Sequence, residues 1–128
     1  MKFLLDTHCF LWAISDSSLL SKKVVYYLEN QDNELFLSSA SVWEIFIKFS
    51  IGKLKLLKDP EKLILDEMQF GNYKSLEIKM NHIFPMIKLP NIHKDPFDRI
   101  LICQAITEGL TIITNDPIIK KYKVKTAW

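Results

Sequence analysis

Short apolar runs in this sequence alternate with longer stretches in which apolar residues recur every three or four positions. The first run, Lys2 to Leu5, stops abruptly at Asp6, which is typical of a buried strand that ends at the edge of a sheet. The same pattern predicts four further strands: Glu34 to Leu37, Tyr73 to Ile78, Thr111 to Thr114 and Val124 to Trp128.

The stretches between these strands have helical spacing and several clear end signals. Ser21, Asp59 and Asp95 can each cap a helix, and proline follows the two aspartates at a position where its missing N–H costs nothing. Gly52 suits the left-handed position after a helix end. The predicted helices are Leu11 to Ile14, Ser21 to Asn30, Ser38 to Ile51, Pro60 to Phe70, Asn81 to Ile87 and Pro96 to Glu108.

Strands separated by helices imply right-handed crossovers. They predict an α/β fold with a mostly parallel central sheet that helices cover on both faces. The chain has 128 residues, 48% of them hydrophobic, which suits one compact domain spanning residues 1–128. We see no repeat, low-complexity tract or linker that would divide it.

Composition limits the possible functions only in part. The 17 basic and 15 acidic residues leave a net charge of +2, so any nucleic-acid binding must come from a local patch. Cys9 and Cys103 lie in apolar stretches without the spacing of a zinc or disulfide framework, and we expect buried thiols. The N-terminus lacks a signal-peptide cleavage site and no run approaches a membrane span, so we expect a cytoplasmic protein.

The segment "HKDPFDR", residues 93–99, places several charges at the start of a predicted helix. Asp95 before Pro96 is a strong helix cap, and Asp98 lies in the first turn, where the helix dipole favours a negative charge. Capping therefore explains Asp95 well and Asp98 partly. We interpret His93 as a loop residue that caps the helix or touches a phosphate.

Acidic residues also follow the predicted strands, where ligands of parallel sheets collect. Asp6 follows "FLL" and Asp116 closes "TND" after "TII", while Glu44 lies in the helix that begins after "LFL". Singly, Asp6 and Asp116 suit turns, and Ser41 with Glu44 matches a capping box. Together with Asp98, however, these acids would gather at one end of the sheet and repel one another unless a cation were present.

A hard divalent cation would remove this conflict. Mg²⁺ or Mn²⁺ prefers carboxylate oxygens and keeps water ligands that a phosphate can share. Such a site suits phosphodiester hydrolysis, because the metal activates a water and stabilises charge on the phosphorus and on the leaving oxygen. The three histidines are too scattered in the sequence to form a metal trio.

Four blocks of the sequence together resemble a PIN-domain ribonuclease of the VapC toxin type. They are "LLDTH" with "LW" close behind, "SSASVWEIFIKFSIGKLKL", "LPNIHKDPFDRILICQAITEGLTIITND" and the closing "YKVKTAW". The resemblance runs in the same order from Lys2 to Trp128 and is weakest at Asp59 to Phe70. It implies a three-layer α/β/α sandwich and a Mg²⁺- or Mn²⁺-dependent endoribonuclease, silenced by an antitoxin of a type II toxin–antitoxin system.

The resemblance also implies roles for individual residues. Asp6, Glu44, Asp98 and Asp116 match the acidic quartet of the family, which binds the metal and is catalytic. Thr7, Thr114 and Asn115 sit where the family places small polar groups beside the quartet. For Arg99, we expect either a pair with one of the acids or a contact with RNA phosphate, against the alternative of a solvated surface arginine.

An RNA substrate needs basic groups near the acids. The candidate lysines are Lys48, Lys53, Lys55 and Lys58 after Glu44, and Lys120, Lys121, Lys123 and Lys125 after Asp116. Aromatic residues in excess of one small core suggest a partner surface for the antitoxin, at Phe10, Trp12, Trp43, Phe46, Phe49 and Phe70. The resemblance places the antitoxin in a groove of the first two helical regions and implies a homodimer.

Two other classes of protein are compatible with strand-end acids. A receiver domain that accepts a phosphoryl group is also a small parallel α/β protein, but it would need adjacent acids after its first strand and a lysine near its last. A catalytically inactive PIN-like module that acts only by binding is the other alternative, although four intact acids argue against it.

Overall fold

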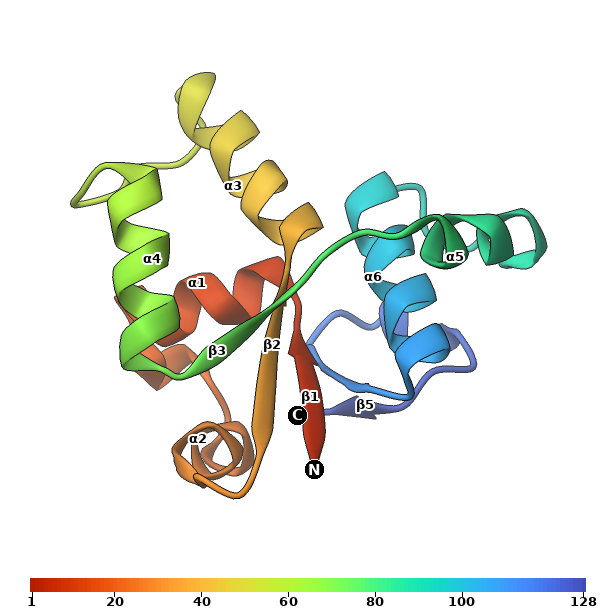
Figure 1. Ribbon diagram of the computed structural model, residues 1–128, viewed down its shortest axis with the longest axis horizontal. Helices are drawn as coiled ribbons and strands as arrows, with labels where there is room; N and C mark the ends of the chain where they lie inside the picture. Colours follow the sequence, from red (N-terminus) through yellow and green to blue (C-terminus); the bar gives the residue numbers. More distant parts are fainter.

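The computed structural model describes all 128 residues and contains a five-stranded sheet in which every neighbouring pair of strands is parallel (Figure 1). The strands are β1 (Lys2–Leu5), β2 (Glu34–Ser38), β3 (Tyr73–Leu76), β4 (Thr111–Ile113) and β5 (Thr126–Ala127). Their order across the sheet is β3-β2-β1-β4-β5. This confirms the predicted α/β class. It contradicts the receiver alternative, since doubly wound domains of that kind have the order 2-1-3-4-5.

Six α-helices and three 3₁₀ helices connect the strands. None of the helices is both long and apolar enough to cross a membrane. The α-helices are α1 (Thr7–Ser15), α2 (Lys22–Glu29), α3 (Ser39–Ser50), α4 (Pro60–Phe70), α5 (Met80–Ile83) and α6 (Pro96–Glu108), and the 3₁₀ helices are η1 (Ser17–Leu19), η2 (Phe84–Lys88) and η3 (Ile119–Lys121).

The predicted helix caps are confirmed. The side chains of Ser21, Asp59 and Asp95 accept backbone N–H groups in the first turns of α2, α4 and α6, at distances of 3.1, 3.3 and 2.8 Å. Gly52 has the left-handed conformation expected after a helix end, with φ +75°. Local sequence therefore fixes where these helices begin and where α3 stops.

Several boundaries differ from the prediction for local reasons. The first helix starts at Thr7 rather than Leu11, because Asp6 caps it by accepting the Cys9 N–H at 2.7 Å. The predicted helix Asn81 to Ile87 is divided into α5 and η2. Pro85 lies at the start of η2 and has no N–H with which to continue an α-helical ladder.

The capping box predicted for Ser41 and Glu44 is wrong. Ser38 caps α3 by accepting the Ala40 N–H at 3.0 Å, so Glu44 lies beyond the first turn.

Two strands are also shorter than predicted. β3 ends at Leu76, before Ile78, whose N–H donates to the Ser39 side chain at 3.2 Å instead of to a strand. β5 is shorter than predicted and pairs only with β4.

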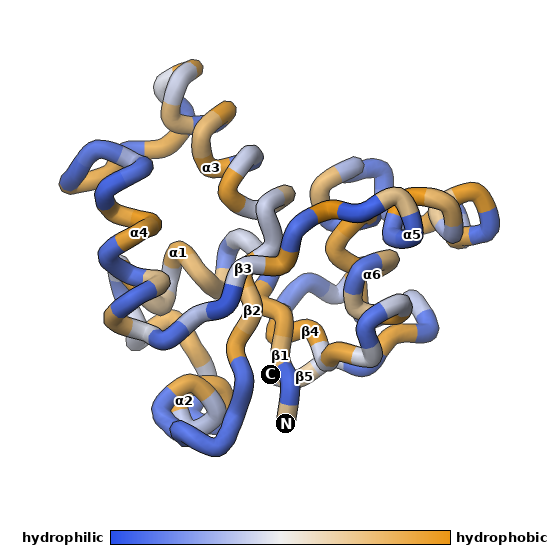
Figure 2. Tube along the Cα trace, in the orientation of Figure 1, coloured by the Kyte–Doolittle hydropathy of each residue, from blue (hydrophilic) through white to orange (hydrophobic).

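Helices cover both faces of the sheet, as the three-layer prediction requires. Phe3 and Leu5 of β1 pack into a buried cluster with residues of α1, α2 and α4, whereas Leu4 packs into a second cluster with α6. This division follows from the alternation of side chains along a strand. Apart from the hydrophilic start of β1, both β1 and β4 are coloured mainly as hydrophobic at the centre of the fold (Figure 2), as is typical of strands buried on both faces.

The direction of the crossovers changes between β1 and β4. The chain leaves β1 towards β2 and β3, then returns to pair β4 with the other edge of β1. Such a switch point opens a crevice beyond the carboxyl ends of the two strands. α3 stands beyond this end of the sheet (Figure 1) and contacts both α1 and α6.

Replacement of Gly109, which ends α6 with φ +69°, should destabilise the protein through its backbone alone. A Cβ added at Gly109 would meet no atom within 4 Å, so steric contact plays no part. We expect Gly109→Ala to lower the free energy of unfolding by about 1–2 kcal/mol in urea denaturation. Gly109→Asn is the matched control and should cost less, because asparagine tolerates the left-handed conformation. Equal losses in both variants would contradict this explanation.

Candidate functional site

Asp6 and Asp116 lie at the carboxyl ends of the two strands that form the switch point. The Asp6 N–H donates to the Ile113 carbonyl at 3.1 Å, which ties the end of β1 to β4. The Asp116 N–H donates to Thr114 Oγ1 at 3.0 Å, and Asp116 Oδ1 accepts the Ile118 N–H at 2.8 Å. Both acids line one cavity of about 310 Å³, together with His8, Cys9, Trp12 and Asn115.

Asp98 reaches the same place from the first turn of α6. His93, in the loop before α6, places Nε2 2.9 Å from Asp98 Oδ2 and 3.2 Å from Asp116 Oδ2. Potential ligand atoms of these three residues all lie within 4.8 Å of one another. A cation could therefore be held between α6 and the end of β4.

Glu44 completes the acidic set from α3, and it is only 4% exposed. One oxygen, Oε2, accepts from Lys48 Nζ at 2.7 Å. The other oxygen, Oε1, is buried and has no hydrogen-bond partner. A buried carboxylate oxygen without a partner carries a desolvation cost, so this atom requires an explanation such as a catalytic role or a bound ion.

The raised pKa of Asp98 reflects its burial and how close these acids lie to one another. The pKa of the Asp98 carboxyl is raised from an ordinary 3.8 to about 7. Burial is the largest cause, and the nearby charges of Asp95, Glu44 and Asp6 act in the same direction, against the opposing effect of His93. Asp6 and Glu44 lie outside the 4.8 Å group, yet they are near enough to act on Asp98. The predicted acids therefore share one electrostatic environment.

The small polar residues beside the acids hold the surrounding elements together. Thr7 Oγ1 donates to Ser41 Oγ at 3.0 Å, and this buried bond joins α1 to α3. Thr114 is fully buried and orients Asp116 through the bond described above. Asn115 is exposed at the rim of the cavity.

Both cysteines are buried, as predicted. Burial raises the pKa of the Cys9 thiol, and the neighbouring Asp6 raises it further. Burial also raises the pKa of Cys103. Thiols held in the protonated form are poor nucleophiles. Cys9 therefore lines the cavity without offering thiolate chemistry.

Arg99 has partners that the sequence did not indicate. Its guanidinium donates to the Pro90 carbonyl at 2.9 Å, to the carbonyls of Leu89 and His93 at 3.5 Å, and to the Tyr122 hydroxyl at 3.3 Å. The side chain thus binds the loop before α6 rather than an acid. Tyr122 was absent from the predicted site, and nothing in its sequence context distinguishes it from a core aromatic.

Two of the eight candidate lysines have acidic partners. Lys48 pairs with Glu44, and Lys58 lies 3.5 Å from Asp66, so both have acidic partners. The remaining lysines of the two clusters are exposed; they are Lys53 and Lys55 after α3, and Lys120, Lys121, Lys123 and Lys125 in and after η3.

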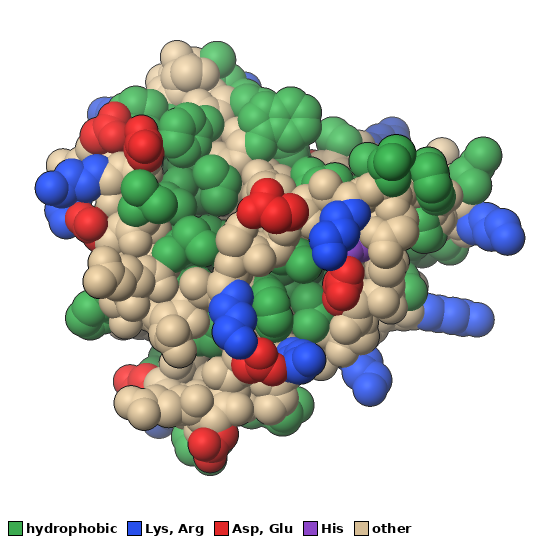
Figure 3. Space-filling model, viewed as in Figure 1, with side chains coloured by type: hydrophobic (Ala, Val, Ile, Leu, Met, Phe, Trp, Pro, Cys, Tyr) green, Lys and Arg blue, Asp and Glu red, His purple; other side chains and the backbone are tan.

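Most of the aromatic residues predicted as partner contacts are exposed. Trp43 is 60% and Phe70 90% exposed, and Phe46 and Phe49 are partly so. Hydrophobic side chains gather over α3 and α4 and again over α5 in the space-filling view (Figure 3). Phe10, by contrast, is fully buried and belongs to the core.

Several solved structures share this fold. A chain of VapBC2 from Rickettsia felis, bound to a DNA fragment from their promoter, matches with a TM-score of 0.75 and 18% identity over 100% of this chain and 99% of that chain. VapBC-1 from nontypeable Haemophilus influenzae matches with a TM-score of 0.68 and 17% identity, over 99% of this chain and 97% of that chain. FitAcB from Neisseria gonorrhoeae matches with a TM-score of 0.66 and 17% identity, over 97% of this chain and 95% of that chain.

Sequence comparison identifies the family itself. No curated protein sequence matches the chain significantly. The PIN domain family, however, matches residues 3–125, which is nearly the whole chain. The match includes all four predicted acids and both strands of the switch point. The resemblance noted in the sequence is thereby confirmed, and this chain belongs to the PIN-domain family.

Proposed function

We propose that this protein is a Mg²⁺- or Mn²⁺-dependent endoribonuclease and the toxin of a type II toxin–antitoxin pair. Asp6, Glu44, Asp98 and Asp116 are its catalytic, metal-binding acids. The observation that carries the proposal is the meeting of these carboxylates at the switch point, with one buried oxygen of Glu44 left without a partner.

The residues at the site fit a hard divalent cation. Every proposed ligand offers carboxylate oxygen, which Mg²⁺ and Mn²⁺ prefer, and no thiolate competes. A cation would give Glu44 Oε1 a partner and would favour the ionised form of Asp98, whose pKa is raised to about 7 without it. When bound, such an ion supplies an activated water and a positive charge for the phosphate that is cleaved.

The protein side chains would orient the acids and the RNA. Thr114 fixes the backbone that carries Asp116, and the Thr7 to Ser41 bond holds α1 against the helix that carries Glu44. The exposed lysines of the two clusters would neutralise phosphates on either side of the cut. Asn115, at the rim of the cavity, would contact the RNA strand.

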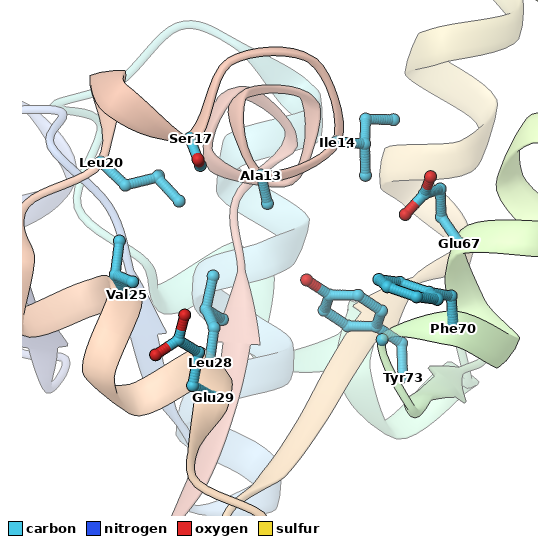
Figure 4. A pocket seen from close by; sticks show the side chains of 11 residues that line it. Ala13, Ile14, Ser17, Leu20, Val25, Leu28, Glu29, Glu67, Phe70 and Tyr73 are labelled. Carbon is cyan, nitrogen blue, oxygen red and sulfur yellow. The ribbon is translucent and has the colours of Figure 1, made fainter.

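The antitoxin would bind the apolar surface near α4. A cavity of about 240 Å³ lies between α1, α2 and α4, with Phe70 and Tyr73 on one side and Leu28 on the other (Figure 4). Phe70 is 90% exposed although it is large and apolar. The similar structures come from VapBC and FitAB complexes, which supports a protein partner on this fold. By the same resemblance we propose a homodimer that acts in the cytoplasm.

Loss of any one of the four acids should abolish RNA cleavage without unfolding the protein. We expect Asp6→Asn and Asp116→Asn to lose more than a hundredfold of the Mn²⁺-dependent cleavage rate on a mixed RNA pool, and EDTA to abolish cleavage by the wild type. Asp66→Asn is the matched control, because its carboxylate lies on exposed α4 in a weak surface pair. Absence of metal-dependent cleavage by the folded wild type would favour the inactive binding module instead.

Asp98→Asn should stabilise the metal-free protein at high pH. Since the folded-state pKa of about 7 exceeds the ordinary 3.8, the folded protein binds more protons here than the unfolded chain between these values. The contribution of Asp98 to stability is therefore full at low pH and is lost as the pH rises through 7. In urea denaturation with EDTA, we expect Asp98→Asn to gain on the order of 1 kcal/mol over wild type at pH 8 and little at pH 4.

Asp98→Asn also tests whether the gain in stability comes from the Asp98 carboxylate or from a general stabilising effect of the substitution. Added Mn²⁺ should raise the melting temperature of the wild type at pH 8 more than that of Asp98→Asn, since a ligand stabilises only the state that binds it. A constant difference between the two proteins at every pH would contradict the assigned pKa.

Substitution of Phe70 should separate toxicity from its neutralisation. Phe70→Arg places a charge on the apolar surface proposed for the antitoxin, while the acids lie elsewhere. We expect growth arrest on expression of the variant, as for wild type, but loss of rescue by a co-expressed antitoxin that protects against the wild type. Glu61→Arg, on an exposed part of α4, is the control. Full rescue of Phe70→Arg would place the antitoxin on another surface.

A further inference from the structure

We infer that His93 is a positioning residue of the proposed metal centre. Its Nε2 lies between one oxygen of Asp98 and one oxygen of Asp116: it forms a hydrogen bond with the Asp116 oxygen and lies within ion-pair distance of the Asp98 oxygen. The two distances are 2.9 Å to Asp98 Oδ2 and 3.2 Å to Asp116 Oδ2. One ring thereby joins the acid of α6 to the acid that follows β4. This inference rests on the proposed function, because it concerns the acids that would bind the cation.

The hydrogen-bond pattern identifies which ring nitrogen carries the hydrogen. The Asp95 N–H donates to His93 Nδ1 at 3.2 Å, so Nδ1 is an acceptor and carries no hydrogen. The hydrogen of the ring therefore lies on Nε2, which faces the two carboxylates. Asp95 itself caps α6, so the ring orientation is tied to the start of the helix that carries Asp98.

Hydrogen bonds to the buried Tyr122 side chain fix the backbone of His93. The Tyr122 hydroxyl accepts the His93 N–H at 2.7 Å and the Ile92 N–H at 3.1 Å, and Tyr122 is only 5% exposed. Arg99 donates to the same hydroxyl and to the Pro90 carbonyl at 2.9 Å. The loop before α6 is thus held from two sides, and the His93 ring has little freedom to leave the carboxylates.

These contacts favour a positioning role over direct ligation. Both ring nitrogens already have partners, whereas a carboxylate oxygen keeps lone pairs that remain free for a cation. Without the Nε2–H donor, Asp98 and Asp116 would repel each other and rotate independently, so a cation would have to gather them itself. Loss of such supporting hydrogen bonds weakens metal binding by about 10–100-fold in other metal sites.

Two substitutions of His93 test this role in the full-length protein. In His93→Asn, the short side chain keeps an oxygen that can accept the Asp95 N–H but cannot reach the carboxylates. In His93→Gln, the longer amide can present an N–H to them. Calorimetric titration with Mn²⁺ should show at least tenfold weaker binding for His93→Asn and affinity nearer to wild type for His93→Gln. Melting temperatures in EDTA should agree within a few degrees.

Tyr122→Phe provides a second test that leaves the His93 ring in place. It removes the acceptor of two backbone N–H groups, so the loop should lose its fixed position and Mn²⁺ binding should weaken in the same direction. Mn²⁺ affinity in His93→Asn equal to or tighter than that of wild type would overturn the inference, as would an equal loss in His93→Gln. Failure of the wild type itself to bind Mn²⁺ would instead overturn the proposed metal function together with this inference.

Discussion

Four carboxylates share the carboxyl edge of two adjacent parallel strands, and the cost of keeping them together constrains the rest of the structure. Asp6 and Glu44 are buried, and burial together with neighbouring acids raises the pKa of Asp98 and so opposes its ionisation. The surrounding fold holds this arrangement through β1, the central strand of the sheet. β1 is buried on both faces and paired along both edges, so the end of that strand cannot yield to the repulsion.

The protein offsets part of this cost with local partners. The amide end of α1 binds Asp6, Lys48 binds one oxygen of Glu44, and His93 lies between Asp98 and Asp116. One oxygen of Glu44 remains without a partner. Stability is thus given up at the place where chemistry is proposed, as is common where active sites concentrate charge.

Much of the fold and the positions of the acids could be predicted because they depend on local signals. The run before Asp6 reads as a buried strand, and Asp95 with Pro96 marks a helix start in any context. The parallel arrangement followed from the alternation of strands and helices. Since parallel strands present their carboxyl ends together, acids distant in sequence could be assigned to one site. The resemblance to PIN domains then distinguished Asp98 from Asp95, which periodicity alone did not.

The remaining features depend on tertiary contacts that no local pattern reveals. Asp6 reads equally well as a turn residue, so the sequence predicts the start of the first helix at Leu11, four residues after its actual start at Thr7. The partners of Arg99 are backbone carbonyls of a loop and a hydroxyl 23 residues away, and such pairs leave no periodic signal. The sequence marks His93 only as a loop residue, because its two carboxylate partners come together only when α6 docks against β4.

The strand order has a consequence for how the nascent chain matures on the ribosome. β1 is made first but sits between β2 and β4, and its pairing with β4 needs residues 111–113. The acids at positions 6 and 116 therefore remain apart until residues 111–116 have left the exit tunnel, since parallel pairings distant in sequence form late. A chain still on the ribosome would thus carry the proposed metal site unassembled until β4 has emerged and paired with β1.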